Sequence, residues 1–364
     1  MGESTLSVGI VGCGIGREHA KAYVEIPDLY EIKAFCDIDE AKADKLAQEY
    51  GTATIYTTYD ELLADDGIDV VDICTPPHLH FSQSVAALKA GKQVICEKPL
   101  VESLERVDQL KQIEAGAKGM LMPIFQNRFG HGYQKMLHLV KTGITGKAFL
   151  TTVELTWYRG AAYYAVDWRG KWATERGGCL LIHGIHSLDL CLALMGKPVK
   201  VKAMTTTRVN PIETEDCAVL AVEMESGALL SISVTLGSVS ERSRIRTCWS
   251  NVSAESAHAT HDHNHADWTF EARSPEVAAR IEEALRNLEL APSAYVGQFT
   301  LFHKAIHGGG EPPITIDDAR NVIALLTAVY ASAHSGGEKA LPIERSDPLY
   351  KDWVPESFRT KNNA

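Results

Sequence analysis

Residues 8–16 read Val8-Gly9-Ile10-Val11-Gly12-Cys13-Gly14-Ile15-Gly16, and this stretch decides the fold. Its apolar half predicts a buried strand, and its glycines predict a tight turn into a helix that begins near Arg17. Gly12 permits the turn, and Gly14 lets a pyrophosphate approach the backbone N–H groups at the positive end of that helix. The glycine spacing is one residue shorter than in the usual dinucleotide-binding fingerprint, so the turn alone also fits an ordinary strand–helix connection.

Asp37 makes the dinucleotide-binding interpretation of the glycine turn more specific. It follows the second predicted strand, Ile32–Cys36, at the position expected for ribose recognition. A carboxylate there accepts hydrogen bonds from two ribose hydroxyls and repels a 2′-phosphate. The two features together predict an NAD site, in preference to NADP, formed by Gly12, Gly14, Ile15, Gly16 and Asp37.

Outward from the turn, residues 1–125 alternate short apolar strands with amphipathic helices. This alternation predicts an α/β domain with a doubly wound parallel sheet. Further strands are expected at Thr54–Tyr56, Asp69–Cys74, Gln93–Cys96 and Met120–Phe125, with helices over Asp39–Tyr50 and Phe81–Ala90, one capped by Thr58 or Asp60 and one capped by Ser103.

Two loops carry polar residues to the carboxyl edge of this sheet. Glu97-Lys98-Pro99 directly follows one strand, which places a cation where open α/β sheets bind their ligands. Thr75, Pro76 and His80 follow the neighbouring strand, and we expect them to face the cofactor. For His80, a solvated or capping role is the alternative.

Residues 126–364 show a different pattern, with longer alternating segments that predict an α+β domain with a large, mostly antiparallel sheet. The expected strands are Lys147–Trp157, Val199–Val209, Asp216–Met224, Ala228–Leu236 and Arg242–Ser250. The expected helices are Tyr133–Lys141, Ile185–Leu194, Pro275–Leu290, Tyr295–Ile306 and Asp317–His334, and residues 251–274 are expected to form a loop.

The composition excludes several classes of protein. The chain has 364 residues, of which 45% are hydrophobic and 23% charged, as in ordinary globular proteins. A net charge of −11 argues against a nucleic-acid partner. No apolar stretch approaches the roughly 18 residues of a membrane span, and the N-terminus lacks a signal-peptide pattern. We therefore expect a cytoplasmic protein whose eight cysteines are reduced.

These motifs resemble the Gfo/Idh/MocA oxidoreductase family, which includes glucose–fructose oxidoreductase and inositol dehydrogenases. The resemblance lies in the glycine turn with Arg17-Glu18-His19-Ala20, in Thr75-Pro76-Pro77, in Glu97-Lys98-Pro99 and in Gly177-Gly178 with His186-Ser187-Leu188-Asp189. It implies a Rossmann domain joined to an α/β domain whose open sheet often forms the oligomer interface, and hence a homodimer or homotetramer. It also implies that Lys98 lies between the nicotinamide and the substrate hydroxyl, with Glu97 near the nicotinamide ribose, and that the Lys98–Pro99 bond is cis.

The resemblance assigns His186 to the substrate carbinol. Many family members have an aspartate four residues before this histidine, whereas this chain has Ile182, with His183 beside it. The aspartate that would orient the imidazole is missing, so either His183 or Lys98 takes part of that role or this chain has weak or different chemistry. We expect Lys98 and His186 to form the proton-transfer pair.

Aromatic and polar side chains cluster in the segments expected to recognise substrate. Aromatic rings stack on the C–H faces of sugars, and arginine or asparagine bonds hydroxyls or a carboxylate. The candidates are Asn127, Arg128, Tyr158, Arg159, Trp168, Arg169, His183 and Asp189, for each of which a purely structural role is an equal alternative. The sequence thus predicts an NAD(H)-dependent oxidoreductase acting on the CH–OH group of a sugar, cyclitol or related small polyhydroxy compound.

Two other functions remain open at this point. One is an enzyme of the same fold that retains NAD and cleaves glycosidic bonds, and the other is a non-catalytic NAD-binding regulator, which only Ile182 favours. Histidines at 258, 261, 263 and 265 have a poor spacing for a closed metal shell, so we expect no metal.

Overall fold

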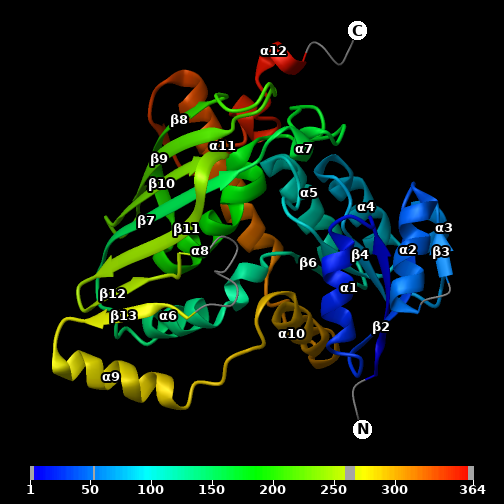
Figure 1. Ribbon diagram of the computed structural model, residues 1–364, viewed down its shortest axis with the longest axis horizontal. Helices are drawn as coiled ribbons and strands as arrows, with labels where there is room; N and C mark the ends of the chain where they lie inside the picture. Colours follow the sequence, from blue (N-terminus) through cyan, green and yellow to red (C-terminus); the bar gives the residue numbers. More distant parts are fainter. Residues whose placement is uncertain (1–3, 52–53, 259–266, 360–364) are drawn as a thin grey trace. The chain divides into compact units, whose positions relative to one another are not determined.

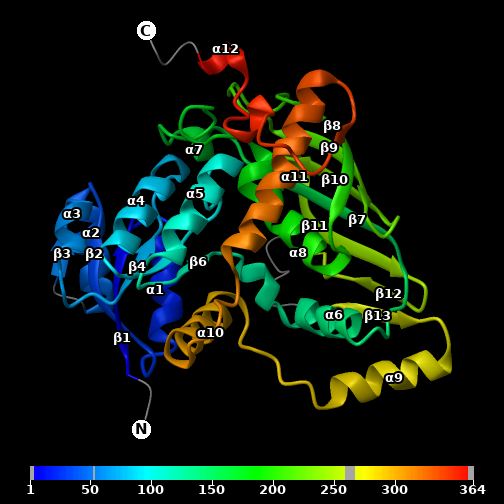
Figure 2. The same cartoon turned by 180° about the vertical axis from the view of Figure 1, so that it is seen from behind.

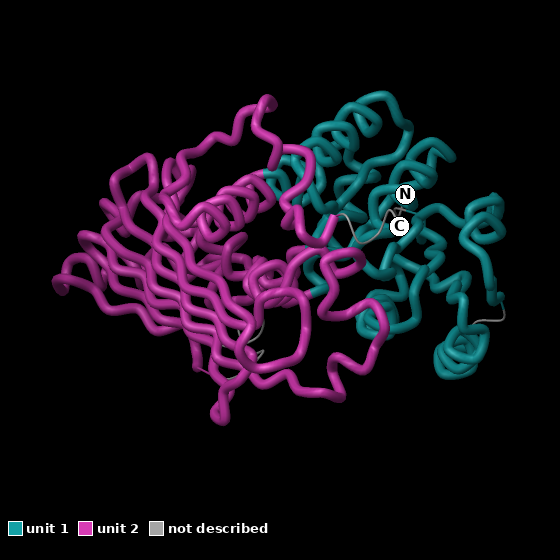
Figure 3. Tube along the Cα trace, turned by 90° about the horizontal axis from the view of Figure 1, so that it is seen from above, with its two compact units in different colours: residues 1–124, 295–320 teal, residues 125–294, 321–364 magenta. Residues whose placement is uncertain are grey.

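A computed structural model describes residues 4–51, 54–258 and 267–359. The chain forms two compact units, residues 1–124 with 295–320 and residues 125–294 with 321–364 (Figure 3). The first unit therefore also contains residues 295–320, which lie outside the expected Rossmann domain of residues 1–125. The reason is helix α10 (Ala294–Gly308), whose Phe299 ring stacks on that of Tyr23 with 4.5 Å between centroids. The main-chain carbonyl of Phe299 also accepts a hydrogen bond of 2.9 Å from Tyr30 Oη.

The first unit is built on a fully parallel six-stranded sheet with the order β3-β2-β1-β4-β5-β6 (Figure 1). The order reverses between β1 and β4, and the carboxyl ends of strands at such a reversal flank the crevice in which open α/β sheets bind ligands. The predicted doubly wound sheet is confirmed. The strands are β1 (Leu6–Val11), β2 (Tyr30–Cys36), β3 (Thr54–Tyr56), β4 (Val70–Ile73), β5 (Gln93–Cys96) and β6 (Leu121–Pro123). The remaining helices of this unit are α1 (Gly16–Val24), α2 (Glu40–Tyr50), α3 (Tyr59–Leu63), α4 (Pro77–Lys89) and α5 (Leu104–Ala115).

Local sequence explains where several of these helices begin. Thr58 and Ser103 have extended backbones, and their hydroxyls accept hydrogen bonds from Glu61 N and Arg106 N at the starts of α3 and α5. Such N-caps satisfy backbone donors that a helix leaves open. The expected caps at Thr58 and Ser103 are thus confirmed.

The second unit holds an eight-stranded sheet with the order β13-β12-β11-β7-β10-β9-β8-β14. Neighbouring strands are antiparallel except for the parallel pair β7 and β10, which confirms the predicted mostly antiparallel sheet. The strands are β7 (Ala148–Tyr158), β8 (Pro198–Thr206), β9 (Cys217–Met224), β10 (Leu229–Thr235), β11 (Gly237–Trp249), β12 (Val252–Glu255), β13 (Thr269–Ala272) and β14 (Lys339–Ala340).

Helices α6, α8 and α11 lie against one face of this sheet (Figure 2). The other face bears exposed apolar side chains on three adjacent strands, namely Met204, Val219 and Leu229.

The helical segments of this unit are η1 (Gln126–Phe129), α6 (His131–Lys141), α7 (Ala161–Tyr164), η2 (Leu180–Gly184), α8 (Ile185–Met195), α9 (Pro275–Arg286), α11 (Ile316–Ser335), η4 (Pro348–Tyr350) and α12 (Glu356–Arg359), with the first turn of α11 in the other unit. Within the described residues, no helix is long and apolar enough to cross a membrane.

The expected loop at 251–274 is wrong in part. It contains the edge strands β12 and β13, which pair with each other and extend the sheet from β11. Val252 joins a small apolar cluster with Leu139, Ile144 and Ile281. An alternation of only four residues is too short to be recognised as a strand in the sequence. Pairing with β11 makes the first segment a strand, and pairing with β12 does the same for the second. Of the histidine cluster, His258 hydrogen-bonds Glu255 at 2.7 Å, and positions 261, 263 and 265 lie outside the described residues.

Candidate functional site

The turn between β1 and α1 has the shape that a pyrophosphate needs. Gly12 has a φ of +95°, and a Cβ there would lie 2.6 Å from the carbonyl oxygen of Cys74, so only glycine fits. At Gly14 a Cβ would meet no atom within 4 Å, which leaves open space beside the backbone. Ile15 occupies the N-cap of α1, makes no side-chain cap bond and is 42% exposed. A phosphate group would accept from backbone N–H groups at this helix end.

Asp37 is tied directly to that turn. Its carboxylate accepts hydrogen bonds from Cys13 N at 2.8 Å and from Asp39 N at 2.9 Å. The carboxylate thus has a fixed position beside the glycine turn, at the end of β2. Ile38 follows it and is 96% exposed, an apolar side chain that the sequence did not single out. Together, the open glycine turn and the fixed carboxylate fit an NAD molecule.

His80 has a different position from the one expected. It is fully buried, and its ring nitrogens lie 2.7 Å from the carbonyl oxygen of Pro99 and 2.8 Å from that of Thr75. The ring therefore joins the loop after β4 to the loop after β5. We revise its expected role from cofactor contact to support of these loops. Thr75 remains half-buried and bonds Gln83 through its hydroxyl at 2.6 Å, while Pro76 is the N-cap of α4.

Glu97 and Lys98 stand at the end of β5. Lys98 is half-buried, its bond to Pro99 is cis as expected, and its N–H donates to Glu97 Oε2 at 2.9 Å. Glu97 is only 4% exposed and accepts from Tyr295 Oη at 3.1 Å. The Glu97 carboxylate therefore holds the peptide group from which the Lys98 side chain extends.

In the second unit, the two histidines lie on a distorted helix start. Residues Leu180–Gly184 form one turn of π-helix that contains His183, and His186 lies in the first turn of α8 directly after it. π-Turns are rare and frequently mark functional sites. Ile182, at the position of the missing aspartate, is 8% exposed and packs in the core. His183 Nε2 is 3.4 Å from Tyr163 Oη, and its ring centroid is 5.0 Å from that of Trp157.

The entry to this π-turn is fixed by Glu215, which the sequence did not single out. Its buried carboxylate accepts from Gly178 N at 2.9 Å, Leu180 N at 3.1 Å and Tyr330 Oη at 3.0 Å. A Cβ on Gly178 would lie 1.8 Å from the Glu215 carbonyl oxygen, which explains this member of the glycine pair. Burial raises the pKa of Glu215 to about 7, although these hydrogen bonds act to lower it.

Arg128 and Asp189 form a bidentate ion pair instead of two separate substrate contacts. Arg128 Nε and Nη2 donate to the carboxylate at 2.7 and 2.6 Å, and Asp189 is 1% exposed. The pair joins η1 to α8. We therefore revise both residues to a positioning role, since a buried carboxylate requires such a partner. Asn127, in the same turn, is also buried.

The other substrate candidates form an aromatic–arginine cluster beside His183. The Arg169 guanidinium lies 3.9 Å from the ring centroid of Tyr163 and 4.3 Å from that of Trp168. The Arg159 guanidinium lies 5.1 Å from the Trp157 ring, and Tyr158 is 59% exposed. The structure thus brings Arg159, Trp168 and Arg169 together with His183.

Comparisons with known proteins agree with this geometry. Residues 6–125 match the model of an oxidoreductase family with an NAD-binding Rossmann fold, and residues 133–255 match the model of the GFO/IDH/MocA C-terminal domain. The chain is 30% identical to D-glucoside 3-dehydrogenase of Escherichia coli (strain K12) over 217 residues, which are 59% of this chain and 61% of that relative. This match thus spans less than two thirds of the relative's length.

Two further relatives match over nearly the whole chain. D-xylose 1-dehydrogenase (NADP(+)) 2 of Haloferax volcanii is 26% identical over 332 residues, 90% of this chain and 97% of that protein. The WlbA dehydrogenase of Chromobacterium violaceum, solved in complex with NADH and UDP-GlcNAcA, superposes with a TM-score of 0.84 at 26% identity and covers 94% of this chain and 98% of that one. The two family models together match most of the chain, on both units. The protein therefore belongs to the Gfo/Idh/MocA family of NAD-binding oxidoreductases.

Proposed function

We propose that this protein is an NAD(H)-dependent dehydrogenase or reductase that acts on a CH–OH or carbonyl carbon of a sugar, a cyclitol or a related polyhydroxy compound. The observation on which this rests is Lys98, a half-buried amino group at the carboxyl edge of the parallel sheet, with its own peptide N–H bonded to Glu97. The names of the relatives support the substrate class, because they include dehydrogenases of a glucoside and of xylose.

The residues of the chain have distinct tasks in this proposal. Gly12, Gly14, Ile15 and Gly16 bind the pyrophosphate, and Asp37 accepts from the ribose and disfavours a 2′-phosphate, so that NAD is preferred over NADP. The bound cofactor supplies the hydride acceptor or donor. As a neutral amine, Lys98 Nζ takes the proton of the substrate hydroxyl in oxidation, and as an ammonium it returns that proton in reduction.

His186 is the second residue of the proposed proton-transfer pair. The Phe125 ring meets its ring edge-on, with 6.4 Å between centroids. Arg159, Trp168, Arg169 and His183 are proposed to contact the hydroxyl groups and C–H faces of the substrate.

The purified protein, screened by NADH fluorescence in both directions against polyols, inositols, aldoses, sugar acids and keto-sugars, tests the proposal. For a substrate found in this way, Lys98→Met should lower kcat by about 10³-fold, the range of general acid–base catalysis, and should leave NAD affinity within a few fold. Lys89→Met, at the exposed end of α4, is the matched control.

A Lys98→Met variant that retains kcat within tenfold contradicts the catalytic assignment. NAD binding without turnover of any compound in the screen would instead favour the retained-cofactor enzyme or the regulator.

We further propose that the exposed face of the eight-stranded sheet pairs with a second copy of the chain to form a homodimer or homotetramer. Met204 and Val219 are paired on adjacent strands and are 67% and 51% exposed, and Leu229 on the next strand is 52% exposed; exposed apolar side chains on one sheet face favour burial. Sedimentation of the wild-type protein and of Val219→Lys, for which we expect dissociation, checks this proposal.

A further inference from the structure

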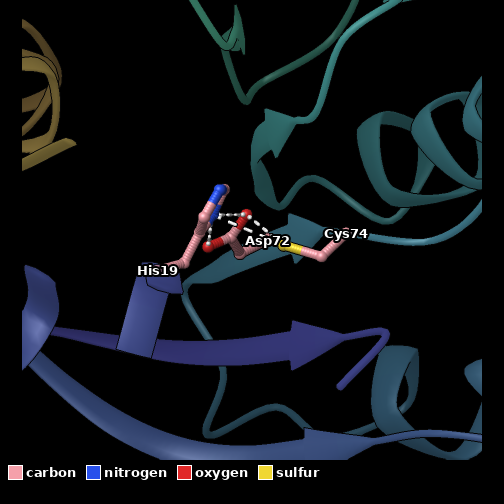
Figure 4. Close-up of side chains that lie close together, drawn as sticks. All are labelled: His19, Asp72 and Cys74. Atoms are coloured by element: carbon pink, nitrogen blue, oxygen red, sulfur yellow. Dashed lines mark hydrogen bonds and ion pairs between the residues drawn. The ribbon is translucent and has the colours of Figure 1, made fainter. Parts of the chain in front are cut away.

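A chain of three titratable side chains lies buried next to Lys98. His19 comes from α1, Asp72 from β4 and Glu97 from the end of β5, and their exposed fractions are 0%, 0% and 4%. His19 Nδ1 lies 2.9 and 3.1 Å from the two oxygens of Asp72, and His19 Nε2 lies 3.1 Å from Glu97 Oε1. Figure 4 shows the His19 ring pointing at the Asp72 carboxylate, with the Cys74 thiol beside it.

The hydrogen bonds around this chain define where its protons are. Asp72 also accepts from Tyr23 Oη at 2.9 Å and from Cys74 Sγ at 3.5 Å. Burial raises the pKa values of the Tyr23 phenol and the Cys74 thiol well above their usual ranges, so both groups keep their protons and act as donors.

Glu97 is likewise surrounded by donors. Tyr295 Oη donates to one oxygen and Lys98 N to the other, and burial raises the pKa of Tyr295 well above its usual range. Both carboxylates are thus arranged as acceptors, and a neutral imidazole would turn one lone pair toward one of them. An imidazolium donates at both nitrogens and satisfies both carboxylates.

The electrostatic balance agrees with this assignment. Burial is the largest single influence and lowers the pKa of His19, but the Asp72 carboxylate and the Cys74 side chain together outweigh burial and raise the pKa well above 6.5. The titratable groups that face the ring are Asp72 and Cys74 on the β4 side, Glu97 after β5, and Tyr295 on α10, whose ring centroid is 4.4 Å away. Tyr23, on α1 itself, reaches the cluster through Asp72.

A metal site is the other chemistry that such residues suggest. Ligand atoms of His19, Asp72 and Cys74 lie within 4.8 Å of one another. However, His19 Nδ1 already bonds Asp72 directly at 2.9 Å, which leaves no room for an ion between them, and the thiol is protonated. We therefore assign the cluster as a hydrogen-bonded ion chain.

We propose that His19 is a permanently charged positioning residue, which holds Glu97 as an anion and thereby fixes the peptide group of Lys98 relative to the glycine turn. The path is continuous: α1 begins at the glycine turn, His19 lies three residues after Gly16, and Glu97 links its ring to Lys98 N. The positioning part of this proposal rests on the proposed function of Lys98, whereas the charge on His19 does not.

The charge can be measured on the wild-type protein without any substrate. In an imidazolium the two ring ¹⁵N nuclei have similar chemical shifts, whereas in a neutral ring they differ strongly. At about pH 8, where exposed histidines have lost their extra proton, the His19 ring should retain the imidazolium pattern. The resonance is assigned by its loss in His19→Gln. A neutral His19 ring at about pH 7 would overturn the proposal, whatever the enzyme's substrate.

The positioning role is measured by kinetics. His19→Gln should lower kcat by about 10- to 100-fold, because a neutral side chain cannot hold two buried anions and Glu97 then loses its fixed place. The matched control is His303→Gln, because His303 is also a buried histidine of this unit, where it contacts Tyr30 and bonds Ser4 O. A kcat within twofold of wild type in His19→Gln contradicts the positioning role.

The isosteric Asp72→Asn keeps the proposal testable should His19→Gln fail to fold. Removing the Asp72 charge lets His19 release its proton at a lower pH. The ratio of kcat in Asp72→Asn to wild type should therefore fall at least fivefold as the pH rises from about 5 to about 9, a range that spans the ordinary pKa of an imidazole. A ratio that stays constant over this range overturns the proposal, because a merely structural role of Asp72 would not depend on pH.

Discussion

Each unit contains a buried glutamate near a proposed catalytic residue, and the two are stabilised differently. Glu97, beside Lys98, faces the His19 ring, which Asp72 keeps positively charged. Glu215, at the entry to the turn before His186, has neutral donors, namely the backbone N–H groups of Gly178, Leu180 and Glu215 itself and the Tyr330 hydroxyl. Burial therefore raises the pKa of Glu215 to about 7. The neutral hydrogen bonds lower the pKa of Glu215 without offsetting its burial, whereas Glu97 has the His19 ring as a partner.

The largest effect is expected from breaking the charged chain. Asp72→Asn should lower the free energy of unfolding by about 4 kcal/mol at neutral pH, because it removes one charge from a buried ionic network. Urea unfolding measures this loss. Asp69→Asn, one residue before β4 and exposed, is the control and should cost less than about 1 kcal/mol. A loss below about 1 kcal/mol in Asp72→Asn would show that His19 and Glu97 do not need Asp72.

The second effect is a pH dependence that only Glu215 should produce. Between pH about 4.5 and about 7, the folded state holds a proton on Glu215 that the unfolded state releases. The free energy of unfolding therefore falls as the pH rises through this window, by about 3 kcal/mol in all, and the loss is complete above pH about 7.

In Glu215→Gln this contribution disappears. The difference in unfolding free energy between variant and wild type should therefore change by about 3 kcal/mol between about pH 5 and about pH 8, in favour of the variant at the higher pH. Denaturant unfolding at both pH values gives the result. Parallel stability curves for the two proteins would mean that Glu215 titrates as an ordinary carboxyl group.

The smallest effect is expected from two tyrosines, each of which donates a hydrogen bond to one of the two buried glutamates. Tyr295 and Tyr330 are both buried, and their hydroxyls donate to Glu97 and Glu215 at 3.1 and 3.0 Å. Tyr295→Phe should cost about 2 kcal/mol, since its acceptor is charged, and Tyr330→Phe about 1 kcal/mol at about pH 6, where Glu215 is mostly neutral. Equal costs in thermal or urea unfolding at that pH would remove the proposed distinction between the two sites.

Several parts of the site could be predicted from sequence because they depend on local chemistry. The glycine turn, Asp37 after β2 and Lys98 after β5 occupy the expected places, since a strand that ends in a turn fixes its own last residues. The edge strands β12 and β13 were missed, because a four-residue alternation has no meaning until a neighbouring strand pairs with it.

The roles of Arg128 and Asp189 also required tertiary structure. Each residue alone has the chemistry of a sugar-binding side chain, but 61 residues of sequence separate the two partners of this ion pair. His80 is similar, because its expected contact with a cofactor was replaced by two carbonyl groups that the chain brings to its ring.

The sequence by itself determined the family, the parallel and antiparallel sheets, the NAD-binding turn and the lysine at the sheet edge, because each depends on a short motif or a regular period. Only the tertiary structure decided which partners surround each buried carboxylate. In one unit the partners of Glu97 come from α1, the end of β5 and α10, and Asp72 on β4 contacts one of them. In the other unit the partners of Glu215 come from the segment that enters the π-turn and from α11. Burial and neighbouring charge set a protonation state, and neither quantity exists until distant segments of the chain come together.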